Sequence, residues 1–179
     1  MRIQAVGSAF PPNYYSQEEL LAEFRRLWAG KLFNPERLEQ LHENVLVGGR
    51  HLALPIDGYH ELDSFGDAND AWIRVGLEVG AAATGDALGR AGLRPNEIDA
   101  LFFVSVTGIA TPSLDARLIN RLGLPTDVAR TPIFGLGCVA GAAGIARAAD
   151  YVKAYPDRVA VLVSVELCSL TLQREDFSV

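Results

Sequence analysis

The run of residues 100–106, ALFFVSV, constrains the fold of this chain more than any other segment, because it is almost wholly apolar. A strand with one face in water alternates apolar and polar residues, whereas a continuous apolar run is typical of a strand covered on both faces. Two more buried strands are expected at 131–136 and 159–165, with helical stretches between the three runs. Buried strands that alternate with helices indicate a parallel sheet, so we expect an α/β fold.

Helix ends are marked by capping residues, proline and glycine. Ser16 with Glu19 three residues later forms a capping box, and it predicts a helix that runs to about residue 29 and stops at Gly30. Proline suits the first helical turn, so Asn34-Pro35 predicts a second helix that ends near residue 44. Later helices are expected over 113–122, beginning at Ser113, and over 139–154.

Three expectations concern the segments between these elements. Residues 3–10 are interpreted as a first strand that Pro11 and Pro12 close. Residues 46–65 hold several glycines and a proline, which predicts an exposed, irregular connection. A long helix follows, capped by Asp67 or Asn69 and ended by Gly92.

Composition and charge exclude several classes of function. The formal net charge of −6 argues against nucleic acid as a partner, because phosphate binding needs a basic face. No apolar stretch is long enough to span a bilayer and no signal peptide is recognised, so we expect a cytoplasmic protein. The two cysteines and three histidines lack the CxxC or HExxH spacing of metal ligands, and no metal is expected.

The chemistry of the chain is indicated by residues 133–144, IFGLGCVAGAAG. An apolar strand ends in glycine, Cys138 follows, and a helix of very small side chains begins. Free amide groups and the dipole at a helix N-terminus favour an anion, and a thiolate is such an anion. The small neighbours leave space for a substrate, so Cys138 is a candidate nucleophile. A buried cysteine in a helix-packing motif explains the same pattern, and spacing alone leaves both readings open.

Three segments resemble one family. The segment 137–141, GCVAG, is similar to the nucleophile motif of chalcone-synthase-like enzymes, the type III polyketide synthases. The segments 106–115, VTGIATPSLD, and 163–171, VSVELCSLT, resemble that family's cavity loop and the strand after its nucleophile. The spacing of 28 residues from Cys138 to Glu166 also fits. The resemblance extends from about Phe65 onward. The residues of these segments most resemble those of bacterial alkylpyrone and alkylresorcinol synthases.

The resemblance implies a thiolase-like fold, of which this chain is the N-terminal half in an αβαβα layered architecture. It implies that Cys138 takes an acyl group, with a long chain, from acyl-CoA. Malonyl-CoA then loses carbon dioxide, and the carbanion condenses with the thioester to give alkylpyrones or alkylresorcinols. No cofactor is bound covalently, the substrates are coenzyme A thioesters, and the enzyme is a homodimer.

The resemblance also implies binding residues. Thr107 and Thr111 lie in the cavity loop, and Thr111 holds a position that reaches into the neighbouring subunit's site. Cys168 and Thr171 hold positions where side-chain size governs the length of starter and product. Each has a plainer alternative, since a threonine before a helix is often a turn residue and Cys168 can be a small core side chain. Glu166 is interpreted as structural, with a hydrogen-bond partner.

Coenzyme A needs basic contacts, and the N-terminal region is the richest in positive charge. Arg50 is the candidate there, although basic residues in this region also suit solvated helix faces.

The chain departs from the family's pattern after the nucleophile. The family's catalytic histidine and asparagine lie beyond the cysteine, whereas neither residue type follows Cys138 here. Phe177 is too close to the nucleophile to be the family's gatekeeping phenylalanine. We therefore expect residues 1–179 to be an N-terminal domain without its C-terminal half. A truncated record, a split enzyme and a degenerate acyl-binding protein all fit that expectation.

Two rival functions remain at this level. A β-ketoacyl synthase III-like enzyme of fatty-acid synthesis would depend on acyl carrier protein. A non-catalytic acyl-binding or dimerisation module would have an unreactive Cys138.

Overall fold

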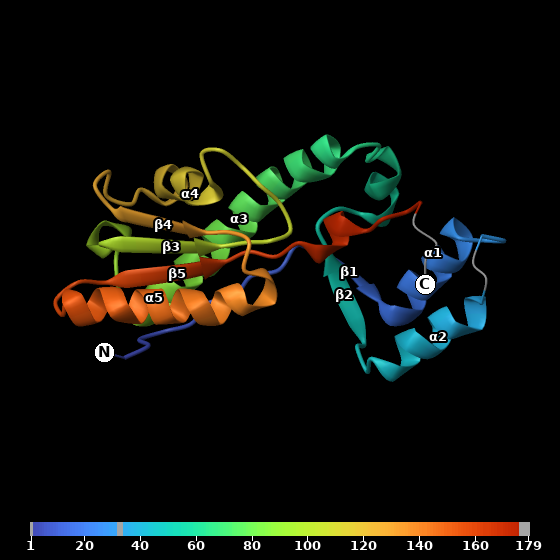
Figure 1. Ribbon diagram of the computed structural model, residues 1–179, viewed down its shortest axis with the longest axis horizontal. Coiled ribbons are helices and arrows are strands. Elements are labelled where there is room, and N and C mark those ends of the chain that lie inside the picture. Colours follow the sequence, from blue (N-terminus) through green and yellow to red (C-terminus); the bar gives the residue numbers. More distant parts are fainter. Residues whose placement is uncertain (1, 32–33, 176–179) are drawn as a thin grey trace.

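A computed structural model describes residues 2–31 and 34–175, so Phe177 lies outside the described residues. Its centre is a parallel sheet in the order β4-β3-β5. These strands are β3 (Ala100–Val104), β4 (Ala129–Ile133) and β5 (Ala160–Ser164). The parallel pairing confirms the α/β fold, because each crossover between the strands passes through a helix (Figure 1).

Helices cover both faces of this sheet (Figure 1). The helix α5 (Ala140–Ala154) packs on β5 and β3 from one side. On the other side lie α3 (Phe65–Ala91) and α4 (Leu114–Leu122). The central strand β3 is buried at all five positions, which confirms the reading of its apolar run.

The outer strands are less buried than expected. Four of the five residues of β4 are exposed and the fifth is half-buried, so the expectation of a buried strand there is wrong. In β5 only Val163 is buried. Both are edge strands with β3 as their only strand neighbour among the described residues, so each lacks cover along one edge.

Helix ends follow local capping chemistry. The capping box of Ser16 and Glu19 is present at the start of α1 (Gln17–Leu27). The Asn34 side chain accepts from the Arg37 N–H at the start of α2 (Pro35–Asn44). Gly92 ends α3 in the left-handed conformation, as expected.

The N-cap of α3 differs from the one expected from the sequence. Ser64, and neither Asp67 nor Asn69, is the N-cap, and its hydroxyl accepts from the Asp67 N–H. Asp67 accepts in return from the Ser64 hydroxyl, which holds the pKa of Asp67 below its ordinary value. Asn69 binds the backbone of Ile109 instead, with its amide both donating and accepting.

A smaller lobe contains α1, α2 and an antiparallel ribbon of β1 (Asn13–Ser16) and β2 (Gly49–Leu52) (Figure 1). Two expectations for this part of the chain are wrong. Residues 3–10 form no strand, because they lie along α3, where Gly7 faces the backbone of Ala83 and Ala87. Residues 46–65 are not wholly irregular, since they contribute β2 and a 3-10 helix, Ile56–Glu61.

The segment after β5 ties the lobes together. Ser169 Oγ accepts from the Ala53 N–H at 3.1 Å and from the Tyr59 hydroxyl at 2.7 Å. Burial raises the pKa of Tyr59, which keeps its hydroxyl a donor. The Trp28 indole donates to the Arg174 carbonyl at 3.0 Å. Across the described ranges, no helix is long and apolar enough to cross a membrane.

Candidate active site

The candidate residues follow the carboxyl ends of the parallel strands. Val104 of β3 pairs with Ile133 of β4 and with Ser164 of β5, so the three strands end level with one another. Open α/β sheets bind ligands outside the carboxyl ends of their strands. Thr107 lies in the loop after β3, Cys138 in the turn after β4, and Cys168 four residues after the end of β5.

Cys138 lies at a strand-to-helix turn. Between β4 and α5, Gly135 (φ 85°) and Gly137 (φ 58°) both adopt the left-handed conformation that favours glycine. Cys138 occupies the middle of a 3-10 turn, Gly137–Val139, and α5 begins at Ala140. The thiol is free and exposed, which does not match a buried packing cysteine.

The surface around Cys138 is open and apolar. A Cβ added at Gly135, Gly137 or Gly141 would meet no atom within 4 Å. The large side chains nearby in the sequence are more than 45% exposed, and they are Phe134 (63%), Leu136 (48%) and Val139 (62%). The described part of the chain therefore leaves room at the thiol for an apolar substrate or for a further protein surface.

Thr107 and Glu166 join the loops that follow β3 and β5. The Thr107 hydroxyl donates to Glu166 Oε2 at 2.8 Å and accepts from the Leu167 N–H at 3.0 Å. The Glu166 carboxylate also accepts from the Val106 N–H. The expectation that Glu166 has a hydrogen-bond partner is confirmed. We call these groups the Thr107–Glu166 clamp.

The loop between β3 and α4, residues 105–113, packs against α3. A Cβ at Gly108 would lie 2.0 Å from Trp72, which is only 2% exposed, so only glycine fits there. Asp115, in the first turn of α4, is fully buried, and it accepts from Arg130 Nε at 2.8 Å and from the Ser113 hydroxyl. Thr111 itself is exposed.

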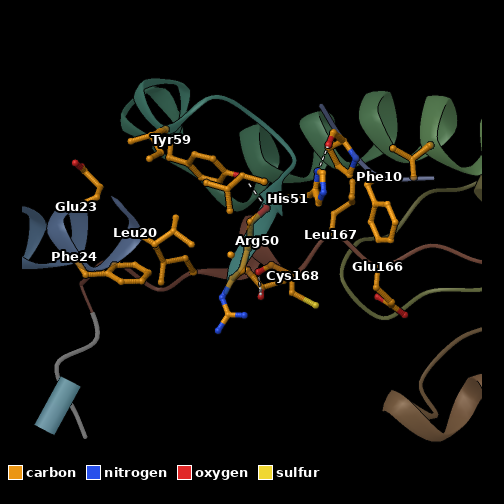
Figure 2. Close-up of a pocket in the computed structure, with 18 of the residues that line it drawn as sticks. Phe10, Leu20, Glu23, Phe24, Arg50, His51, Tyr59, Glu166, Leu167 and Cys168 are labelled. Atoms are coloured by element: carbon orange, nitrogen blue, oxygen red, sulfur yellow. Dashed lines mark hydrogen bonds between the residues drawn. The ribbon is translucent and has the colours of Figure 1, made fainter. Parts of the chain in front are cut away.

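A cavity of about 880 Å³ lies between the small lobe and the segment after β5. Arg50, Cys168 and Thr171 all line it, so three of the residues named from the sequence share one cavity. Figure 2 shows Arg50 and Cys168 in the middle part of the lining of this cavity, with Glu166 toward the α5 side. The backbone of Arg50 pairs with β1, but its side chain makes no hydrogen bond or ion pair with any residue that the structure describes.

Other expected residues lie elsewhere. A second cavity of about 320 Å³ is lined by Thr107 and Thr171. Neither cavity is lined by Cys138 or Thr111. Within residues 2–31 and 34–175, no group of three or more histidine, cysteine or acidic side chains could hold a metal ion.

Several lining residues were not named from the sequence. Phe10 stacks on His51 with ring centroids 5.0 Å apart, and Leu20 and Phe24 of α1 form the opposite wall. They come from segments more than 100 residues before Cys168. No local pattern marks them, because they meet the cavity only through tertiary contacts.

Comparisons with known proteins place these features in a family. Residues 1–175 match the model described as "Chalcone and stilbene synthases, N-terminal domain". This match reaches further toward the N-terminus than the segments that carry the resemblance.

Two relatives and one solved structure, all of them bacterial synthases, illustrate the similarity. The chain is 50% identical over 173 residues to 1,3,6,8-tetrahydroxynaphthalene synthase of Streptomyces peucetius subsp. caesius, covering 97% of the chain and 46% of the relative. It is 35% identical over 169 residues to phloroglucinol synthase of Pseudomonas fluorescens, covering 93% and 48%. The crystal structure of 1,3,6,8-tetrahydroxynaphthalene synthase from Streptomyces coelicolor matches with a TM-score of 0.88 and 36% identity, covering 95% of this chain and 49% of that one. The chain thus spans about half the length of these relatives.

Proposed function

The chain belongs to the chalcone and stilbene synthase family and has the thiolase fold of that family's N-terminal half, and from this premise we propose that it serves a type III polyketide synthase. In this proposal residues 1–179 form the N-terminal thiolase-like domain, and the family's histidine and asparagine come from a C-terminal half. The substrates are an acyl-CoA starter and malonyl-CoA, no cofactor is bound covalently, and the enzyme is a cytoplasmic homodimer.

The observation that carries the proposal is the exposed Cys138 thiol at the glycine turn before α5. Its thiolate attacks the acyl-CoA carbonyl, a C–S bond forms, and coenzyme A leaves as a thiolate. Malonyl-CoA loses carbon dioxide, and the electron pair left on carbon attacks the Cys138 thioester. A C–C bond forms, and the sulfur takes back its electrons as the thiolate.

The binding residues extend this proposal to the walls of the site. Cys168 and Thr171 limit the volume for the growing chain, supported by their place in the 880 Å³ cavity. Arg50 contacts coenzyme A, which is supported by the absence of a partner for its side chain among the described residues. Thr107 binds substrate from the wall of the second cavity. Thr111, which is exposed, reaches into the partner's site.

Two products are candidates. A long-chain starter with malonyl-CoA gives an alkylpyrone or alkylresorcinol, which the size and apolar lining of the larger cavity favour. The 50% identical relative is named for 1,3,6,8-tetrahydroxynaphthalene, and that favours the second candidate. Incubating the complete polypeptide with malonyl-CoA, with and without a long-chain acyl-CoA, separates them by mass spectrometry of the products. A product that contains the added acyl chain supports the first, and a naphthalene product formed from malonyl-CoA alone supports the second.

The nucleophile is tested by intact mass after mixing with acyl-CoA. We expect an acyl adduct on the complete wild-type polypeptide and none on Cys138→Ala. The matched control is Cys168→Ala, which removes the other exposed thiol and keeps the adduct. An adduct that persists on Cys138→Ala shows that Cys138 is not the acyl carrier. Products that form only from acyl carrier protein substrates would instead support the β-ketoacyl synthase reading. Folded wild type with neither adduct nor product would support a non-catalytic acyl-binding module.

A further inference from the structure

One wall of the 880 Å³ cavity is a single face of α1. Leu20, Phe24 and Leu27 all line it. Their spacing of four and then three residues places them on one stripe of the helix. Leu20 is 5% exposed, and the other two are half-buried. An apolar stripe therefore borders open space, whereas such stripes more often pack fully against a core.

Phe24 is held firmly in this wall. Its ring stacks on Trp28 at a centroid distance of 5.1 Å and an interplanar angle of 7°. A second contact, with His42 at 5.4 Å, is edge-on. Trp28 is fixed in turn by the bond from its indole to the Arg174 carbonyl, at 3.0 Å. A ring held from two sides moves aside at a cost, so it can act as a fixed boundary.

The cavity runs from the sheet edge to this ring. Figure 2 shows Glu166 toward α5 at one side, Arg50 and Cys168 in the middle, and Leu20 and Phe24 at the other side. Residues 164–168 all line the cavity, with Ser164, Glu166 and Cys168 exposed and the alternate residues Val165 and Leu167 buried. The path therefore starts on the exposed side of the strand end and finishes at an apolar wall more than 100 residues earlier in the sequence.

We propose that α1 closes the far end of the acyl-chain site and that Phe24 sets the longest starter chain the enzyme accepts. This inference rests on the proposed function, because it assumes that the cavity receives the starter acyl group. A hydrocarbon chain matches a cavity with an apolar end. The boundary lies in the small lobe, away from the nucleophile, so it selects chain length without touching the reacting atoms.

Binding is the direct test, because it does not depend on turnover. The complete polypeptide with Cys138→Ala is titrated with saturated acyl-CoA esters from four to eighteen carbons, and the dissociation constants are measured by calorimetry. While the chain still enters apolar space, each added methylene should tighten binding about fourfold, from the burial of one CH₂ group. The gain should stop at one chain length, where the end of the chain meets Phe24.

Phe24→Ala in the same background should move that limit to longer chains, with affinity for short esters and for coenzyme A unchanged. The matched control is Leu41→Ala on α2, since Leu41 is 48% exposed and does not line the cavity, and it should leave the limit in place. Should Phe24→Ala fail to fold, Leu27→Phe fills the same end and should move the limit to shorter chains.

Three outcomes contradict the proposal. The first is a chain-length limit that stays in place in Phe24→Ala and Leu27→Phe while the stability of the protein falls. The apolar stripe of α1 would then serve only to pack the fold. The second is a change of affinity for free coenzyme A that equals the change for the acyl-CoA esters, since the cavity then holds the coenzyme A moiety and not the acyl chain. The third is the absence of any dependence on chain length. The proposed function is judged separately by product formation in the wild type, so the two can fail independently.

Discussion

Replacing Thr107 by valine tests whether the Thr107–Glu166 clamp is a structural joint. The change keeps the shape of the side chain and removes its hydroxyl, and with it two hydrogen bonds. The Leu167 N–H loses its acceptor in a residue that is 5% exposed, and an unsatisfied buried donor costs about 1–3 kcal/mol. The bond to Glu166 is closer to solvent and adds about 0.5–1 kcal/mol. We therefore expect a loss of about 1.5–4 kcal/mol in the free energy of unfolding.

Urea unfolding of the complete polypeptide, followed by tryptophan fluorescence, measures this loss. Thr107→Ser keeps the hydroxyl and should recover most of the stability. Thr171→Val is the matched control, because the Thr171 hydroxyl donates only to the Cys168 carbonyl at an exposed site, and it should cost less than about 0.5 kcal/mol. A Thr107→Val protein as stable as wild type would refute the structural role of the clamp, and a raised KM for the starter would then leave Thr107 with substrate binding as its only role.

Two further predictions concern backbone packing and pH. Gly108→Ala should destabilise the protein by about 1–3 kcal/mol and change the fluorescence of Trp72, because the new methyl group overlaps that ring. The control is Gly85→Ala, which adds a methyl group in open space on α3 and should be neutral or slightly stabilising. The Val159 N–H donates to Asp99 and holds the pKa of that carboxyl below its ordinary value. A lowered folded-state pKa stabilises the fold above about pH 4 and loses that contribution as the pH falls toward the folded-state pKa. Asp99→Asn should flatten this acid limb of the stability curve, and an unchanged limb in acid titrations would contradict the assignment.

The elements that the sequence predicts well are those with local causes. The strand β3 is marked by its own apolar run, and α1 by the reciprocal bonds of Ser16 and Glu19. The error at the start of α3 is also local, because Ser64 and Asp67 bond to each other and either can be mistaken for the cap. The glycine turn that exposes Cys138 is likewise encoded within a few residues.

The remainder depends on contacts between distant segments. The strands β1 and β2 are short, and they pair residues more than 30 positions apart. No alternation of apolar and polar residues predicts them. Residues 3–10 have strand-like composition, but they pack on a helix. The two residues named for the cavity wall, Cys168 and Thr171, do line a cavity, yet its far wall on α1 depends on tertiary packing that no local rule describes.

The bond between Trp28 and the Arg174 carbonyl has a consequence for the order of assembly during synthesis. It joins positions 146 residues apart, and Ser169 binds the small lobe across separations of 110 and 116 residues. Contacts this distant form late, because the closure of so long a loop must precede them. The N-terminal helices therefore leave the ribosome long before the segment that holds Ser169 and Arg174. Until that segment emerges, it cannot cover the apolar stripe of α1. We expect a nascent chain paused before residue 168 to bind chaperones through its first 60 residues, and to release them once residue 174 has emerged.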